Sequence, residues 1–190
     1  MNVIKTDIEG VVIIEPTIFG DNRGYFFESY SQRQFDAIVR PVRFVQDNES
    51  RSRYGVVRGL HFQKGDYAQS KLVRVTEGRI LDVAVDIRRG SPTFGRYVAI
   101  ELSADNRRQL FIPRGFAHGF SVLSETAVLH YKCDRFYSPE NEASIIWNDA
   151  EIGIDWHIPA ADVILSEKDR RNPTLAEARE LFDYKTDYYA

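Results

Sequence analysis

The sequence predicts a mainly β protein, built as a barrel or sandwich of short antiparallel strands. Short apolar runs end at turn residues throughout the 190-residue chain, which is typical of such folds rather than of alternating strand and helix units. Residues 80–87 alternate between apolar and polar side chains, as a half-buried strand does. Aromatic residues make up 13% of the chain, a share that favours sheet over a helical bundle.

The expected strands are identified by their apolar runs and by the turn residues that close them. They cover residues 11–14, 72–75, 80–87, 97–102 and 109–112. The connections that follow them contain Pro16, Gly78, Gly90, Asn106 and Pro113. Because proline, glycine and asparagine favour tight turns, neighbouring strands in this series are expected to form hairpins. A strand at residues 11–14 would be an aggregation-prone sheet edge unless another strand pairs with it or another segment covers it.

Alternation predicts which side chains share a face of a strand. In residues 80–87 it places Asp82 opposite the aliphatic side chains, so that one face packs while the other lines a polar cavity. The alternative for Asp82 is a solvated face. By the same rule Tyr131 and Cys133 share one face of their strand, and His130 points to the other.

Two short helices are expected at the periphery of the fold. Ser31 and Gln34 have the spacing of a capping box ahead of an apolar pattern. Thr174 and Glu177 repeat that spacing directly after Pro173.

Composition indicates a single globular domain over residues 1–190. Hydrophobic residues make up 43% and charged residues 28%, with a net charge of −3. This balance argues against a nucleic-acid or membrane surface, since such surfaces need a clustered basic excess. The N-terminal residues lack the apolar stretch of a signal peptide, and Cys133, the single cysteine, has no intrachain partner. A cytoplasmic location is expected.

The densest group of reactive side chains lies between Arg58 and Lys71. The imidazole of His61 suits a general base, because its ordinary pKa is about 6.5. A regular strand would place Arg58 and His61 on opposite faces, but Gly59 between them favours a bulge that re-aims side chains. The alternative is that His61 is a hydrogen-bonded core histidine.

A second motif delivers His118 into a strand after the turn at Pro113 and Gly115. The pattern resembles the second motif of the cupin superfamily, small jelly-roll barrels with a central site. Metal-binding cupins usually carry a pair of histidines and a glutamate in their first motif, whereas His61 is followed by Phe62 and Gln63. No metal is therefore expected, and Asp82 is available to orient His118.

Two further cations, Arg23 and Lys168, are candidates for binding a diphosphate, which needs several donors at once. Taken singly, each reads as an ordinary surface cation. The chain has no Gly-x-Gly-x-x-Gly fingerprint and no Walker loop, so hydride and phosphoryl transfer lose support.

These motifs occur together, and in the same order, in a known family. They read Asp21-x-Arg23-Gly24-x-Phe26-x-Glu28, Gln46-Asp47-Asn48-x-Ser50, Arg58-Gly59-Leu60-His61-x-Gln63, Gln69-x-Lys71-Leu72-Val73, Gly115-Phe116-Ala117-His118-Gly119-Phe120, Tyr131-Lys132-Cys133 and Ser166-Glu167-Lys168-Asp169. Through them the chain resembles the dTDP-4-dehydrorhamnose 3,5-epimerases over nearly its whole length. It departs from the common pattern in residues 64–67, where relatives often have prolines, and at Ser70, where alanine is usual.

The resemblance implies a cupin-type jelly-roll core over about residues 10–150, with residues 151–190 packing on it and supplying Asp169. It implies a homodimer without cofactor or metal. The implied reaction converts dTDP-4-dehydro-6-deoxy-D-glucose to dTDP-4-dehydro-L-rhamnose by enolisation and reprotonation at C3 and C5. An epimerase of the same family acting at one carbon stays open. So do a metal-dependent cupin and a cupin that only binds sugar nucleotides.

The resemblance also implies roles for single residues. His61 is the base that Asp169 orients, Tyr131 is the acid on the opposite face of the sugar, and Lys71 stabilises the enolate oxygen. Contacts to the nucleotide or the sugar are implied for Arg23, Phe26, Glu28, Gln46, Asn48, Arg58, Asp82, His118, Tyr137, Glu142 and Lys168.

Overall fold

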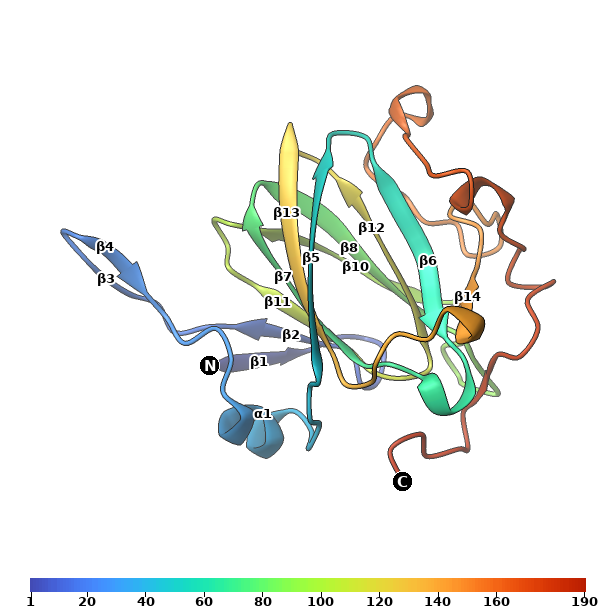
Figure 1. Cartoon of the computed structure of the whole chain (residues 1–190), viewed down its shortest axis with the longest axis horizontal. Coiled ribbons are helices and arrows are strands. Elements are labelled where there is room, and N and C mark those ends of the chain that lie inside the picture. The colour runs from blue at the N-terminus through green and yellow to red at the C-terminus, as the bar shows by residue number, and fades with distance from the viewer.

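The computed structural model describes residues 1–190 as two antiparallel sheets that face each other (Figure 1). One sheet has six strands, in the order β1 (Asn2–Lys5), β2 (Val12–Glu15), β11 (Gln109–Ile112), β7 (Lys71–Glu77), β13 (Thr126–Cys133) and β5 (Gln46–Arg53). The other has five, in the order β10 (Tyr97–Ser103), β8 (Arg79–Asp86), β12 (Phe116–Val122), β6 (Val57–Gln63) and β14 (Glu142–Ser144). The mainly β prediction is confirmed.

The predicted strand at residues 80–87 lies in the middle of the five-stranded sheet and is buried on both faces. Ile80 and Ala84 pack with residues of the opposite sheet, among them Val73 and Leu129. The aliphatic side chains on the other face belong to a separate apolar cluster. Asp82 lies on the first face, so the predicted alternation is confirmed, and its buried carboxylate requires a polar partner.

The C-terminal part of the chain covers the outer face of the five-stranded sheet. Trp156, Leu175 and Phe182 are buried there against Leu81 and Val83. This layer holds little regular structure beyond 3-10 turns and the two-stranded pairing of β15 (Phe182–Asp183) with β9 (Arg88–Arg89). Apolar burial therefore fixes the segment in place.

The first predicted helix is present as α1 (Gln32–Ile38), which starts after Ser31. Its buried Phe35 makes an edge-to-face contact with Phe111 on the outer face of the six-stranded sheet, with ring centroids 5.2 Å apart. The Ser31 side chain makes no capping hydrogen bond. Packing of the apolar face therefore accounts for this short helix.

The prediction of a second helix after Thr174 is wrong. Thr174 and Glu177 do form the reciprocal hydrogen bonds of a capping box, at 2.8–3.3 Å. The turn does not continue, because Glu180 adopts a φ of 55° and Phe182 enters a strand pairing. Burial of Phe182 against Phe62 outweighs the local helical signal.

The predicted strand 11–14 is not an open edge. It forms β2 (Val12–Glu15) and pairs with β1 on one side and β11 on the other. Its apolar composition follows from this internal position and carries no argument for pairing with a second chain.

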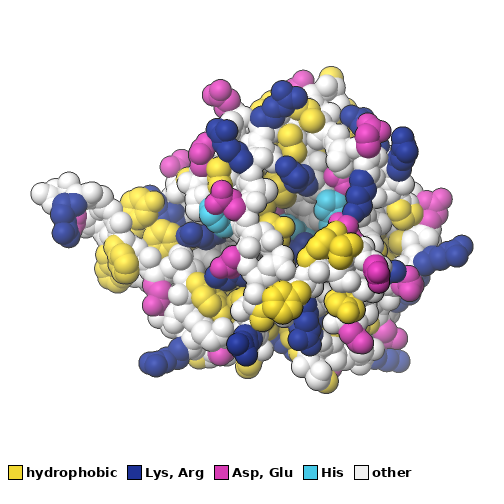
Figure 2. All heavy atoms as spheres, in the orientation of Figure 1, with side chains coloured by type: hydrophobic (Ala, Val, Ile, Leu, Met, Phe, Trp, Pro, Cys, Tyr) yellow, Lys and Arg dark blue, Asp and Glu magenta, His cyan; other side chains and the backbone are white.

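A hairpin of β3 (Phe19–Asp21) and β4 (Gly24–Phe26) projects away from the two sheets (Figure 1). Its aromatic side chains are mostly exposed, with 63% for Phe19 and 69% for Phe26. Figure 2 shows this arm standing clear of the body, with apolar side chains near its base. An exposed apolar arm of this kind is typical of a surface that another molecule covers.

None of the helices in the structure combines the length and apolar character needed to cross a membrane.

Candidate functional site

A pocket of about 320 Å³ opens at one end of the space between the two sheets. Figure 2 shows a hollow on the viewed face with a histidine and basic side chains in and around it. The pocket is lined by Gln46, Asn48, His61, Phe62, Gln63, Gln69, Lys71, Tyr131, Cys133, Tyr137 and Glu142. Seven of these were predicted from the sequence as site residues: Gln46, Asn48, His61, Lys71, Tyr131, Tyr137 and Glu142.

His61 and Asp169 form a close pair at this pocket. Nε2 of His61 lies 2.6 Å from Oδ1 of Asp169, whose side chain is 5% exposed. Burial alone would raise the pKa of the Asp169 carboxyl, but its hydrogen bond with His61 and the histidine charge outweigh burial and lower that pKa. The ionised carboxylate thus orients the imidazole.

The predicted bulge explains how His61 reaches the pocket from β6. Between β6 and β12, Arg58 pairs with Phe120 and His61 with His118, so β6 carries one extra residue over this interval. Gly59 has a φ of 135°, and a Cβ there would lie 2.6 Å from Gly119 Cα. Only glycine fits both the conformation and the close approach.

Lys71 begins β7, after the 3-10 turn at Gly65–Tyr67 and the short connection that contains Gln69. It forms no ion pair, and its ammonium lies 5.8 Å from the centroid of the Tyr131 ring. Burial lowers the pKa of Lys71 against the opposing influence of Cys133, Asp82 and Glu142. The protonated form of Lys71 has no carboxylate partner in the pocket, so its ammonium is suited to an anionic oxygen of a ligand.

Tyr131 faces the same pocket from β13. Burial raises its pKa, as do Cys133 and Glu142, while Arg58 opposes the shift. Burial also raises the pKa of the neighbouring Cys133 to about 11. Both groups consequently keep their protons at neutral pH, and Tyr131 can act as a proton donor.

His118 lies across from His61 in the strand register and is buried. Its Nε2 lies 2.7 Å from Oδ1 of Asp82. Burial lowers the pKa of His118, aided by Lys71 and His61, although Asp82 opposes the shift. The neutral imidazole can thus donate to Asp82 through one nitrogen and present the other to a ligand. No group of three or more His, Cys, Asp or Glu side chains in the structure is arranged to hold a metal ion.

The rim of the pocket carries a polar cluster. The ammonium of Lys168 pairs with Glu142, and Tyr137 donates a hydrogen bond to the same carboxylate at 2.8 Å. Gln46 accepts from the backbone N–H of Tyr137 and donates to Asn48. Burial disfavours the charged form of Glu142, but the Lys168 and Tyr137 hydrogen bonds outweigh it and lower the pKa.

The structure does not bring every predicted residue into the lining of this pocket. Asp169 and Lys168 contact the lining residues His61 and Glu142, and His118 with Asp82 lies beside His61 on the neighbouring strands, but none of these four lines the pocket itself. Arg23 and Phe26 lie on the projecting hairpin, where Arg23 is paired with Asp21 and its side chain is 86% exposed. Glu28 follows the hairpin and accepts a hydrogen bond from Gln34. Arg58 lies beside the pocket rather than in its wall, and its guanidinium donates to Ser52.

Sequence reasoning missed four lining residues: Phe62, Gln63, Gln69 and Cys133. Gln63 and Gln69 stand in the quoted motifs, and their amides hold the backbone of Ser138 and Arg135 at the rim. Ser52, the acceptor for Arg58, was also missed. The alternation of charged with uncharged polar residues over 46–53 is the sequence signal that could have found it, because it places Ser52 on the uncharged face.

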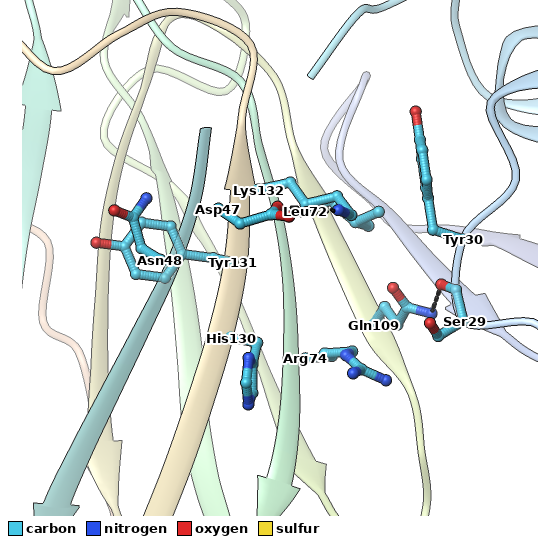
Figure 3. Close-up of a pocket in the computed structure, with 10 residues that line it drawn as sticks. All are labelled: Ser29, Tyr30, Asp47, Asn48, Leu72, Arg74, Gln109, His130, Tyr131 and Lys132. Carbon is cyan, nitrogen blue, oxygen red and sulfur yellow. Dashed lines mark hydrogen bonds and ion pairs between the residues drawn. The ribbon is translucent and has the colours of Figure 1, made fainter. Parts of the chain in front are cut away.

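A second, smaller pocket of about 150 Å³ lies on the other side of β13 (Figure 3). Tyr131 borders both pockets, but in Figure 3 its ring points away from His130 and Lys132, and it lines the larger pocket together with Cys133, which confirms the predicted division of faces. Lys132 pairs with Asp47 and His130 with Glu49. Arg74 also lines this pocket and forms no ion pair, so the choice between the pockets rests on the His61–Asp169 pair, which makes the larger pocket the stronger candidate for chemistry.

Comparison with known proteins identifies close relatives of the chain. Residues 5–177 match the family model described as dTDP-4-dehydrorhamnose 3,5-epimerase. The dTDP-4-dehydrorhamnose 3,5-epimerase of Escherichia coli (strain K12) is 57% identical over 178 residues, which cover 93% of this chain and 96% of that protein.

Solved structures agree with this match. The crystal structure of dTDP-6-deoxy-D-glucose-3,5-epimerase from Legionella pneumophila Philadelphia 1, in complex with dTDP-4-keto-L-rhamnose, has a TM-score of 0.94 at 48% identity, covering 97% of this chain and 99% of that one. A 3'-monoepimerase from Streptomyces bikiniensis in complex with dTDP-quinovose has a TM-score of 0.88 at 33% identity, covering 95% and 92%.

Proposed function

The chain belongs to the dTDP-4-dehydrorhamnose 3,5-epimerase family, and from this premise we propose that its larger pocket epimerises a dTDP-linked 4-keto-6-deoxyhexose. The proposed reaction converts dTDP-4-dehydro-6-deoxy-D-glucose to dTDP-4-dehydro-L-rhamnose. The observation that carries the proposal is the His61–Asp169 pair in a pocket that also holds an unneutralised lysine and a protonated tyrosine.

His61 is the proposed base. The C3 and C5 hydrogens of the substrate flank the C4 ketone, so removal of either one gives an enolate. His61 takes the proton, and the ionised Asp169 stabilises the imidazolium that results. The C–H bond that breaks is re-formed on the same carbon, so the reaction needs no oxidant or reductant.

Lys71 is the proposed oxyanion group. Both deprotonations build negative charge on the same C4 oxygen, and a single fixed ammonium therefore serves both steps. A neutral imidazole is too weak a base for an unassisted ketone. A positioned donor at such an oxygen contributes about 3–4 kcal/mol in comparable sites. Arg58, whose charge acts on Tyr131, and His118, held by Asp82, add polar contacts around the sugar.

Tyr131 is the proposed acid. Inversion requires the new proton to arrive on the face opposite the base. Tyr131 belongs to β13 of the six-stranded sheet, whereas His61 belongs to β6 of the five-stranded sheet, so the two side chains approach the pocket from different walls. Its raised pKa keeps the phenol protonated until the enolate forms.

The nucleotide is proposed to bind along the rim. Lys168 supplies a cation for the diphosphate after rearranging its pairing with Glu142. Tyr137, which is 50% exposed, offers a ring face for the thymine or the sugar. Gln46 and Asn48 present amide groups from the adjacent strand.

A homodimer completes this proposal. Arg23 and Phe26 lie on the projecting arm rather than in the pocket of their own chain, and the exposed aromatic side chains of the arm favour burial by another protein surface. We infer that the arm of one protomer reaches the pocket of its partner. There Arg23 would meet the diphosphate, while Phe26 and Glu28 would contact the nucleotide.

The test is turnover of purified dTDP-4-dehydro-6-deoxy-D-glucose in heavy water, followed by product analysis. Deuterium at both C3 and C5 of a product with the L-rhamno configuration supports the proposal. Deuterium at one carbon only would support the alternative reaction, epimerisation at a single carbon. We keep this alternative because the chain also matches the structure of a monoepimerase. No incorporation at either carbon would contradict both.

A further inference from the structure

Four polar residues close a hydrogen-bonded ring next to the proposed oxyanion group. We call Ser70, Arg114, Asp134 and Tyr189 the Ser70 ring. The Tyr189 hydroxyl lies 2.5 Å from Ser70 Oγ and accepts from the backbone N–H of Arg114 at 3.0 Å. Ser70 N–H donates to Asp134 at 2.6 Å, and the Arg114 guanidinium donates to the other oxygen of that carboxylate at 3.0 Å.

Three members of the ring are shielded from solvent, and the fourth, Tyr189, is half-buried. Ser70 is fully buried, and the side chains of Arg114 and Asp134 are 8% and 3% exposed. Hydrogen bonds between buried groups cannot be replaced by water without local opening of the structure. Each ring member therefore restrains the positions of the others.

Tyr189 enters the ring from the C-terminal tail. Its ring lies between two guanidinium groups, with Arg40 at 3.6 Å and Arg114 at 4.7 Å from the ring centroid. Arg114 also donates to the carbonyl of Tyr188. Tyr188 and Tyr189 lie beyond residues 5–177, the stretch that matches the family model, whereas Arg40 and Arg114 lie within it. The contacts thus join the C-terminal tail to the matched stretch.

The ring meets the pocket through the backbone of β7 and β13. Ser70 directly precedes Lys71, and Asp134 directly follows Cys133, which pairs with Lys71 in the strand register. Ser70 and Asp134 also exchange backbone contacts, since Asp134 N–H donates to Ser70 O. The Ser70 ring thus holds the start of β7 against the end of β13, next to the backbone of Lys71.

We propose that Tyr189 is a positioning residue for the epimerisation, acting through Ser70 to hold Lys71 where the negative charge of the enolate forms. The inference rests on the proposed function. Because charge on the sugar oxygen is greatest in the transition state, misplacement of Lys71 affects turnover more than ground-state binding.

The experiment compares Tyr189→Phe, Ser70→Ala and the double variant with the wild type, using dTDP-4-dehydro-6-deoxy-D-glucose. Each single variant removes one hydroxyl of the same contact. We expect kcat per folded enzyme to fall about fivefold in each, with KM changed less than about twofold. The double variant is expected to be no slower than the slower single variant, because both changes break one link.

Tyr184→Phe is the matched control. The Tyr184 hydroxyl belongs to the same tail but bonds to Glu9 rather than to Ser70. Its kcat is expected to equal that of the wild type. Thermal unfolding of every variant separates loss of folded protein from loss of turnover per folded enzyme.

An unchanged kcat per folded enzyme in Tyr189→Phe, with only a lowered melting temperature, would reduce Tyr189 to a structural role and overturn the inference. Additive losses in the double variant would also overturn it, since the effect would then not pass through Ser70. If Tyr189→Phe does not fold, Ser70→Ala alone decides. A wild type that fails to epimerise the ketosugar contradicts the proposed function itself, a separate result.

Discussion

The pocket combines two groups with opposite protonation requirements. His61 must begin neutral to accept a proton, while Lys71 must be charged to hold the enolate oxygen. Asp169 lies against His61, whereas no carboxylate pairs with Lys71. If a carboxylate neutralised Lys71, the enolate charge would gain little from it. The placement of the carboxylates therefore decides which group acts as base and which as electrostatic stabiliser.

Replacing the base tests this assignment directly. We expect His61→Ala to lower kcat by about 10³-fold, within the range for loss of a general base, while dTDP still binds. The measurement is turnover of the ketosugar together with calorimetric titration of dTDP. His157→Asn is the control, because His157 has a φ of 56° that asparagine tolerates and lies in an exposed loop. Activity near wild type in His61→Ala would remove it from the mechanism.

Removing the Tyr131 hydroxyl separates deprotonation from inversion. In Tyr131→Phe the base remains, so exchange of substrate protons with heavy water is expected to continue after net epimerisation has been lost. Mass spectrometry measures the exchange, and chromatography measures the epimer. Tyr54→Phe, at an exposed tyrosine in the turn that follows β5, serves as control. If exchange and epimerisation both survive in Tyr131→Phe, another acid operates.

The charge on Lys71 determines how kcat depends on pH in the alkaline range. Its pKa lies below the ordinary value of 10.5, so the ammonium loses its charge, and the enzyme its oxyanion donor, as pH rises toward 10.5. Because the pKa of Tyr131 is raised above its ordinary value, the phenol keeps its proton to a higher pH than a free tyrosine does. We expect kcat to fall on the alkaline side below pH 10.5, and Lys71→Arg to move this limb to higher pH. An unchanged limb in Lys71→Arg would contradict the assignment.

The bulge in β6 sets the direction in which the His61 side chain leaves the strand. Without its extra residue, His61 and Arg58 would follow the regular alternation of a strand. Gly59 permits the bulge because its φ is positive and the backbone of Gly119 passes close by. A single position therefore decides whether β6 can present the base.

Gly59→Ala is expected to destabilise the protein by more than about 2 kcal/mol, because it adds a steric clash to an unfavourable φ. Gly90→Ala is the matched control, since Gly90 also has a positive φ, of 83°, but nothing lies within 4 Å of its Cβ position. That change is expected to cost about 1 kcal/mol. Urea unfolding measures both, and equal losses would show that the approach to Gly119 does not matter.

In the proposed dimer, each pocket is built from residues of both chains. If the arm of one protomer completes the pocket of its partner, His61→Ala and Arg23→Ala damage different contributions to the same site. A mixed dimer then contains one pocket with both groups intact. Equal mixing of the two variants with subunit exchange is expected to restore about a quarter of wild-type kcat/KM, since half the dimers are mixed and each has one complete pocket.

Two results would contradict this arrangement. One is the absence of recovery in mixtures that exchange subunits. The other is a strict monomer by light scattering at micromolar concentration. Arg51→Ala is a suitable partner for His61→Ala in the control mixture, because Arg51 is an exposed cation outside the arm.

The sequence by itself determined the features that depend on local periodicity and residue type. Alternation placed Asp82 on the inner face of β8 and separated Tyr131 from His130, and the glycine in Arg58–His61 predicted the bulge. Such features need only neighbouring residues, because strand geometry repeats every two positions. Ordered motifs then indicated the family, which the comparisons confirmed.

The tertiary structure alone decided which distant groups meet. His61 and Asp169 are 108 positions apart, and Ser70 and Tyr189 are 119 apart, so no local pattern relates either pair. The capping box at Thr174 begins a turn rather than a helix in the tertiary structure. Burial of Phe182 in a strand pairing outweighed the local helix signal of the capping box. Contacts of this kind depend on how two sheets and a tail pack together, and packing is set by the whole chain at once.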